Sequence, residues 1–141
     1  MGHQRLSDPG LEVGVRLKVN DPPRVYEVGG HAGAIQIKDC ARVGLQPDEQ
    51  VTFVTESGAE YDVTRKSWGF YATPSLNGRL QSFGLRGALV KSPHGRFYVL
   101  LVERDKEADF QHYLETEGHT VVCWLDNNIA LESLEQKMRD M

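Results

Sequence analysis

Five side chains in the middle of the chain could together hold a small anion. The planar guanidinium of arginine pairs with a carboxylate or phosphate through two parallel hydrogen bonds, which makes Arg79 and Arg86 candidate anion ligands. Trp68 and Tyr71 could supply flat apolar walls against the ring of a ligand, and Asn77 could orient it. The sequence therefore predicts a ligand-binding site at Trp68, Tyr71, Asn77, Arg79 and Arg86.

The distribution of charge favours the same region. From Val63 to Val102 the sequence contains no Asp or Glu, whereas the whole chain has 20 acidic residues and a net charge of −4. The acid-free stretch has six basic side chains, which are Arg65, Lys66, Arg79, Arg86, Lys91 and Arg96. Because β-strands disfavour acidic residues, a plain run of strands is the alternative explanation. In that case Trp68 and Phe70 pack in the core and the arginines face solvent.

Two other binding functions fit the same stretch. Aromatic and basic side chains could bind single-stranded nucleic acid by stacking and phosphate contacts. The acidic remainder of the chain and the absence of an RNA-module signature argue against nucleic acid as the ligand. The exposed rings could instead meet a partner chain or a second copy, so a homo-oligomer is an open alternative.

Motifs for catalysis or metal binding are missing from the sequence. The five histidines show no HxH or HExxH spacing, so we expect no metal site. Ser75 lies outside any GxSxG motif, and the glycine-rich segment at 28–33 precedes a predicted strand rather than a helix, so it predicts a turn. No cofactor is expected. A small isomerase or lyase would still need a titratable group in the pocket, such as His31, His94 or Tyr71.

The cysteines and the N-terminus indicate a cytoplasmic protein. Cys40 and Cys123 form no CxxC pair, and we expect two small, buried side chains, with a disulfide between them as the open alternative. The first residues lack the apolar core of a secretion signal. No apolar run approaches the ~20 residues of a membrane span.

The elements that must position these residues begin with short strands. Residues 1–10 predict a flexible arm, and residues 11–141 a single domain. Apolar alternation predicts strands at 11–19, 24–28 and 34–38, with Asp21-Pro22-Pro23 separating the first two because proline lacks the ladder N–H. Two hairpins follow. The first covers 50–66 around Ser57-Gly58, and the second joins 85–91 to a nearly all-apolar, central strand at 97–102.

The C-terminal third switches to a helical period. Asp105 is a candidate N-cap for a helix that ends at Gly118, and a buried strand follows at 119–126. One of the residues at 126–128 caps a last helix, whose Leu131, Leu134 and Met138 face inward. A strand, a helix and a strand in succession predict a parallel pair. The fold class is therefore α+β. Its β-rich N-terminal two-thirds forms hairpins in a barrel-like or strongly bent sheet, followed by β-α-β-α.

Residues 50–126 also resemble a family of small bacterial proteins of unknown function, through "VTFVTESGAEYDVTRKSWGFYATPSLNGRL", "GALVKSPHGRFYVLLVE" and "VVCWLD". The resemblance implies a bacterial protein associated with surface-sugar biosynthesis, and it carries no catalytic residue to this chain. Together these patterns predict a cytoplasmic binding or accessory domain for a sugar acid, a sugar phosphate or a nucleotide sugar. A small enzyme and a protein-interaction module are the alternatives.

Overall fold

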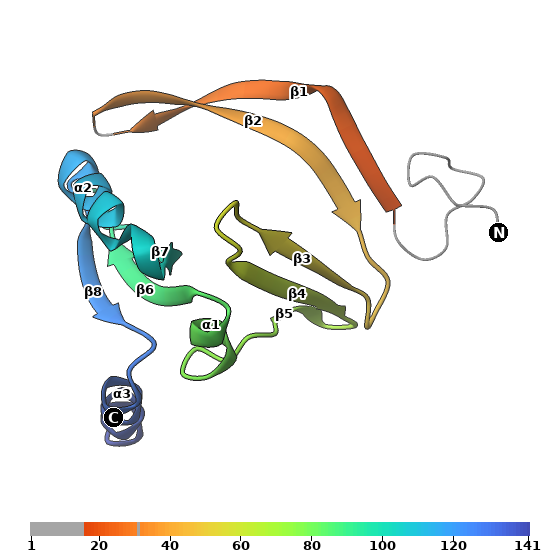
Figure 1. Cartoon of the computed structure of the whole chain (residues 1–141). Coiled ribbons are helices and arrows are strands. Elements are labelled where there is room, and N and C mark those ends of the chain that lie inside the picture. Colours follow the sequence, from red (N-terminus) through yellow and green to blue (C-terminus); the bar gives the residue numbers. More distant parts are fainter. Residues whose placement is uncertain (1–15, 31) are drawn as a thin grey trace. The chain divides into compact units, whose positions relative to one another are not determined.

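The structure is a computed structural model that describes residues 16–30 and 32–141 (Figure 1). These residues divide into two compact units. The first comprises residues up to Val51 together with Val63–Tyr71, and the second comprises Thr52–Asp62 and Ala72–Met141. The predicted α+β class is confirmed, with a β-rich N-terminal part and helices later, and the three sheets do not close into a barrel. The predicted arm at 1–10, the start of the predicted strand at 11–15, and His31 lie outside the described residues. The single domain stays a prediction.

A long two-stranded ribbon dominates the first unit. Strands β1 (Arg16–Gly30) and β2 (Gly33–Gly44) pair antiparallel (Figure 1). The prediction of two separate strands before residue 30 is wrong, because β1 continues through both prolines. The ladder is nevertheless interrupted there. Val19 pairs with Ala41 and Arg24 with Asp39, so residues 20–23 form a bulge where the prolines offer no N–H to the neighbour.

The predicted hairpin around Ser57-Gly58 is confirmed. Strands β3 (Gln50–Val54) and β4 (Glu60–Lys66) are followed by β5 (Gly69–Ala72), which the sequence did not predict, in the order β3-β4-β5. Gly58 has a φ of 95°, which glycine adopts without the strain that a Cβ would bring. All three strands have residues in both units.

The second unit is built on a sheet of order β7-β6-β8. Strand β6 (Leu85–Lys91) pairs antiparallel with both β7 (Phe97–Glu103) and β8 (Thr120–Trp124). β7 and β8 are therefore parallel to each other, but they are not neighbours, because β6 lies between them. The predicted central position of β7 is wrong. It is an edge strand in the described sheet, and its first three side chains, at 97–99, are exposed.

Helices α1 (Arg79–Ser82), α2 (Glu107–Glu117) and α3 (Asn128–Arg139) complete the second unit. Gly118 ends α2 in the left-handed conformation, as predicted. The N-cap prediction for Asp105 is wrong, because it lies in the 3₁₀ turn η2 (Arg104–Lys106) that precedes α2. The side chain of Asn127 caps α3 by accepting from the N–H groups of residues 129 and 130.

Two small apolar clusters form the core of the second unit. One contains Ala59, Leu80 and Leu85, and the other contains Ala88, Val90 and Leu114. The predicted inward face of α3 is wrong, since no residue of this helix is buried and both Leu134 and Met138 are exposed. Cys40 is exposed and Cys123 half-buried, so the prediction of a buried Cys40 is wrong as well. Both thiols are free. None of the described helices has the length and apolar character needed to cross a membrane.

Candidate functional site

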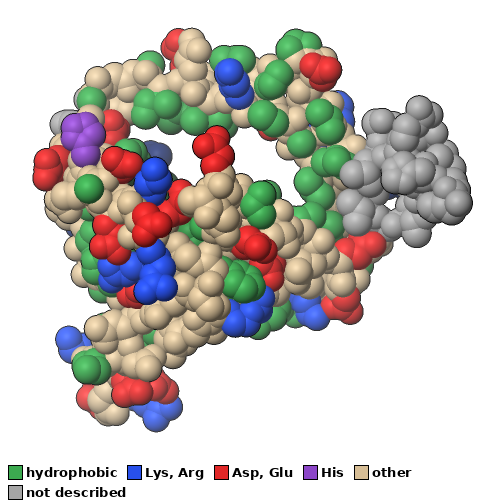
Figure 2. Space-filling view, viewed as in Figure 1, with side chains coloured by type: hydrophobic (Ala, Val, Ile, Leu, Met, Phe, Trp, Pro, Cys, Tyr) green, Lys and Arg blue, Asp and Glu red, His purple; other side chains and the backbone are tan. Residues whose placement is uncertain are grey.

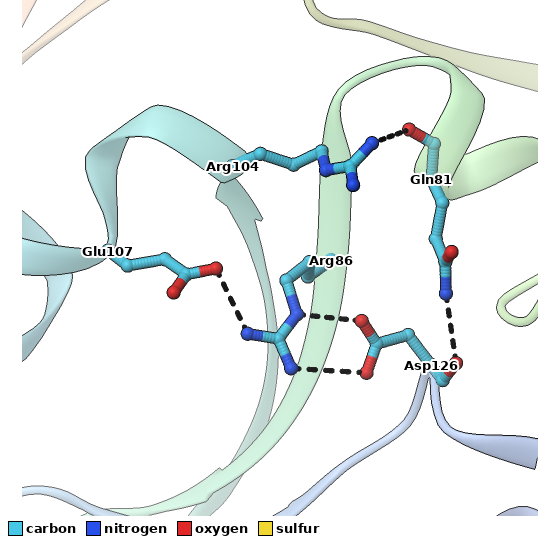
Figure 3. A network of polar contacts seen from close by, with 5 residues as sticks. All are labelled: Gln81, Arg86, Arg104, Glu107 and Asp126. Carbon is cyan, nitrogen blue, oxygen red and sulfur yellow. Dashed lines mark hydrogen bonds and ion pairs between the residues drawn. The ribbon is translucent and has the colours of Figure 1, made fainter.

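Arg86, one of the two predicted anion ligands, is already paired with acidic residues. It lies on β6, and its Nε donates to Oδ2 of Asp126 at 2.7 Å while Nη1 donates to Oε1 of Glu107 at 3.0 Å (Figure 3). The guanidinium carbon also lies 3.9 Å from the ring centroid of Trp124. The hydrogen bond with Asp126 raises the pKa of Arg86 above its ordinary value.

Arg79 and Asn77 also have partners within the second unit. Nη2 of Arg79 donates to Oδ2 of the buried Asp62 at 2.9 Å, and its guanidinium lies 4.8 Å from the centroid of Phe83. Nδ2 of Asn77 donates to Oδ1 of Asn128 at 2.9 Å. An anion would have to compete with carboxylates for both arginines.

Three of the six basic side chains in the acid-free stretch pair with acidic residues from elsewhere in the sequence. Lys66 pairs with Asp48 at 2.5 Å, and Arg79 and Arg86 pair with carboxylates at positions 62, 107 and 126, all outside residues 63–102. Arg65 donates instead to the backbone carbonyls of Leu45 and Lys66. The excess of positive charge in this part of the sequence does not amount to a free positive surface of the same size.

The predicted aromatic walls lie in the first unit. Trp68 is 71% exposed and Tyr71 is 50% exposed, and Phe70 is exposed as well. The alternative that Trp68 and Phe70 pack in the core is wrong. Asn77, Arg79 and Arg86 belong to the second unit. The convergence of all five side chains on one ligand stays a prediction.

A groove that the sequence did not predict lies entirely within the second unit. It has a volume of about 570 Å³, and its walls come from β3, β4, β7 and α2 together with Leu85 of β6. The lining is mainly apolar and aromatic, and it includes Phe53, Tyr61, Leu100, Leu101, Phe110 and Tyr113. Burial raises the pKa of Tyr61, so its phenol is neutral at physiological pH.

The charged residues of the groove are mostly acidic. Glu60, Glu103 and Asp109 line it together with one cation, Lys106. Oε1 of Glu103 accepts from Oγ1 of Thr55 at 2.8 Å and from Oγ of Ser57. The hydrogen bonds from these two hydroxyls, that of Ser57 first, lower the pKa of Glu103 below its ordinary value of 4.5. The groove thus contains a carboxylate that is ionised and held in position.

Sequence reasoning missed this groove for a definable reason. Phe110 and Tyr113 lie within the helix predicted before Gly118, and residues 53–61 lie within the hairpin predicted at 50–66. Their contact with β7 depends on pairs distant in sequence, such as Thr55 with Glu103. No short sequence motif predicts a contact between positions so far apart in the chain.

The described histidines and acidic residues form no metal site. No group of three or more His, Cys, Asp or Glu side chains within residues 16–30 and 32–141 is arranged to hold a metal ion. Comparison of the chain with protein families, with characterised proteins and with solved structures found no match.

Proposed function

We propose that the chain is a binding domain whose groove in the second unit takes an organic cation with an apolar or aromatic body. The observation that carries this proposal is the fixed carboxylate of Glu103 beside apolar walls. Small-molecule sites commonly combine a mostly apolar cavity of roughly 300–1,000 Å³ with a few polar groups that fix orientation. The groove, at about 570 Å³, has this size and composition.

Electrostatics supports a cation rather than an anion in this groove. Three carboxylates and one ammonium line it, so a positively charged group gains attraction and a negative one is repelled. The faces of Tyr61, Phe110 and Tyr113 offer further attraction to a cation. Because Glu103 is already held by two hydroxyls, little side-chain entropy is lost when a ligand pairs with it.

The anionic ligand expected from the sequence, a sugar acid, sugar phosphate or nucleotide sugar, stays a prediction. It requires that Arg79 and Arg86 exchange Asp62 and Asp126 for the ligand. The cytoplasmic location, the association with surface sugars and the small-enzyme alternative also stay predictions.

Two probes of matched size and opposite charge test the proposal. Tryptamine and indole-3-propionate share the indole ring system and differ in the charge of the side chain. We expect isothermal titration to detect tryptamine binding, and the Glu103→Gln variant to bind it about tenfold more weakly, which corresponds to about 1.4 kcal/mol. Glu132→Gln, on α3 and outside the groove, is the control and should leave the affinity unchanged.

The opposite preference would favour the hypothesis drawn from the sequence. If indole-3-propionate binds and tryptamine does not, the proposed cation site is wrong. Loss of that binding in a double Arg79→Ala, Arg86→Ala variant would then assign the anion to the arginines.

A further inference from the structure

The ribbon of β1 and β2 has two chemically different faces. Side chains alternate between the faces of a strand, and residues directly opposite each other in an antiparallel pair share a face. The odd-numbered positions of β2 from 35 to 43 therefore lie on one face with their partners on β1. Five rungs make up this face, in the order Leu17–Val43, Val19–Ala41, Arg24–Asp39, Tyr26–Ile37 and Val28–Ile35.

Four of the five rungs are apolar, and the bulge keeps them on one face. On β1 the apolar residues stand at odd positions, 17 and 19, before the prolines and at even positions, 26 and 28, after them. In a regular strand this change of phase would turn the second half to the opposite face. The bulge at 20–23 sets an odd step of five positions on β1, from Val19 to Arg24, against an even step of two positions on β2, from Ala41 to Asp39, and so restores the face.

The opposite face is mainly polar and basic. Its positions include Lys18, Glu27, Gln36, Lys38 and Arg42, with Val25 as a large apolar side chain among them. We call the first face the apolar strip. It comprises Leu17, Val19, Arg24, Tyr26, Val28, Ile35, Ile37, Asp39, Ala41 and Val43.

Nothing in the described residues buries the apolar strip. No side chain of β1 or β2 is buried, and six of its large apolar residues are between 38% and 58% exposed. Figure 2 shows hydrophobic side chains along the length of the ribbon. An isolated two-stranded hairpin is at best marginally stable in water. An exposed face on which four of five rungs are apolar marks a surface that another protein surface covers.

We propose that the apolar strip is a homodimer interface in which two ribbons pack face to face as a two-layer β-sandwich. The composition of the strip is symmetric about its middle. The ion pair of Arg24 with Asp39, at 2.7 Å, is the central rung, and two apolar rungs lie on each side of it. A two-fold axis through this rung places apolar rungs against apolar rungs in both halves.

The central rung then specifies the register of the dimer. Two arginines and two aspartates meet at the axis, and the four charges sum to zero. A different partner chain would need its own ion pair opposite the Arg24–Asp39 rung, whereas a second copy of this chain supplies that pair by symmetry. A shifted register would place charges against apolar side chains, which costs desolvation energy without a partner.

The size of the strip sets the expected strength of the dimer. Ten side chains per copy are fewer than the ~20–30 residues per partner of a standard interface. We therefore expect a reversible dimer with a dissociation constant on the order of micromolar, near the lower end of specific interfaces. The groove of the second unit contributes no residue to the strip. A failed test of ligand binding therefore leaves the dimer proposal standing, and a failed test of dimerisation leaves the ligand proposal standing.

The adjacent residues Ile37 and Lys38 provide a matched pair of variants, because they lie on opposite faces of β2. Sedimentation velocity of the full chain from about 1 to 300 μM, a range chosen around the dissociation constant expected for a small interface, measures association. We expect the wild type to pass from monomer to dimer, Ile37→Asp to dimerise at least tenfold more weakly, and Lys38→Asp to match the wild type. A wild type that stays monomeric, or a dimer that both variants weaken equally, overturns the proposal.

A charge exchange tests the central rung separately. Arg24→Asp places four carboxylates at the axis and should abolish the dimer. Adding Asp39→Arg restores a neutral rung and should restore the dimer to within about threefold, because exposed ion pairs contribute only ~0–1 kcal/mol to the fold of each copy. Dimerisation of Arg24→Asp as tight as the wild type, or no recovery in a folded double variant, contradicts the proposed register.

Discussion

Arg86 and Asp126 are joined by two hydrogen bonds, from Nε to Oδ2 at 2.7 Å and from Nη2 to Oδ1 at 3.4 Å (Figure 3). The pair links β6 to the loop between β8 and α3, and Gln81 of α1 donates to the backbone oxygen of Asp126. The Asp126 side chain is only 8% exposed, so its charge depends on the guanidinium for compensation. This relationship indicates that Arg86 contributes to the stability of the second unit.

Asp126→Asn should destabilise the protein by about 2 kcal/mol, the usual range for losing a hydrogen bond between charged groups. The amide can accept one bond from Arg86 but leaves the cation without its nearest negative charge. Chemical denaturation measures the change in the free energy of unfolding. Glu107→Gln is the control. It removes the second, half-exposed partner and should cost less than ~1 kcal/mol. If the two variants lower the free energy of unfolding equally, the pair of Arg86 with Asp126 contributes no more to stability than the pair of Arg86 with Glu107.

Glu103 should titrate below its ordinary pKa of 4.5, because Ser57 and Thr55 donate to its ionised form. A folded-state pKa below the unfolded one stabilises the protein above pH 4.5, and this contribution is lost as the pH falls through the folded value. We expect Ser57→Ala to raise the pKa of Glu103 toward 4.5, as followed by NMR of the side-chain carboxyl. Ser82→Ala, which removes a hydroxyl bonded to the carbonyl of Arg79, should leave it unchanged. An unaltered pKa in Ser57→Ala would refute the role of this hydroxyl.

Asn127→Ala should unfold the first turn of α3 more often, because the Asn side chain accepts from two backbone N–H groups there. Loss of such a cap costs about 1 kcal/mol. Hydrogen exchange of the amides at 129 and 130 should accelerate several-fold, while amides of β6 keep their wild-type rates. Uniform acceleration across the second unit would instead mean that α3 stabilises the sheet.

The two cysteines should differ in reactivity. Cys40 is exposed on the ribbon and Cys123 is half-buried on β8, and both are free. A disulfide reagent followed by mass spectrometry should therefore label Cys40 first. Cys40 occupies the face opposite the apolar strip, so labelling should proceed at the same rate at low and high protein concentration. Protection of Cys40 in the dimer would conflict with the face assigned to the interface.

Local patterns predicted the parts of the fold that local physics determines. Gly118 ends a helix because it adopts a left-handed conformation. Asn127, one of the three cap candidates at 126–128, starts another because its side chain reaches two amides. The hairpin at 57–58 follows from turn chemistry in the same way. The sequence Asp21-Pro22-Pro23 predicts an interruption of the ladder, but it does not distinguish a bulge within one strand from the end of a strand.

The wrong predictions concern which other residues pack against each helix, strand or charged side chain. The apolar period of α3 showed that one face is hydrophobic, but not that any part of the described chain packs on it. The all-apolar run of β7 indicated burial on both faces, yet the strand lies at an edge with Phe97 and Val99 exposed. Likewise, composition revealed the excess of basic residues, whereas the carboxylates that neutralise Arg79 and Arg86 come from distant positions.

NMR mapping of the bound probe tests the proposed groove most directly. With tryptamine added, we expect the methyl resonances of Leu100, Leu101 and Val54 to shift, and those of Leu131 and Leu134 on α3 to stay in place. Indole-3-propionate should shift none of the three groove residues at the same concentration. Shifts confined to the surroundings of Arg79 and Arg86, or an equal response to the acid, would contradict a cation site between β7 and α2.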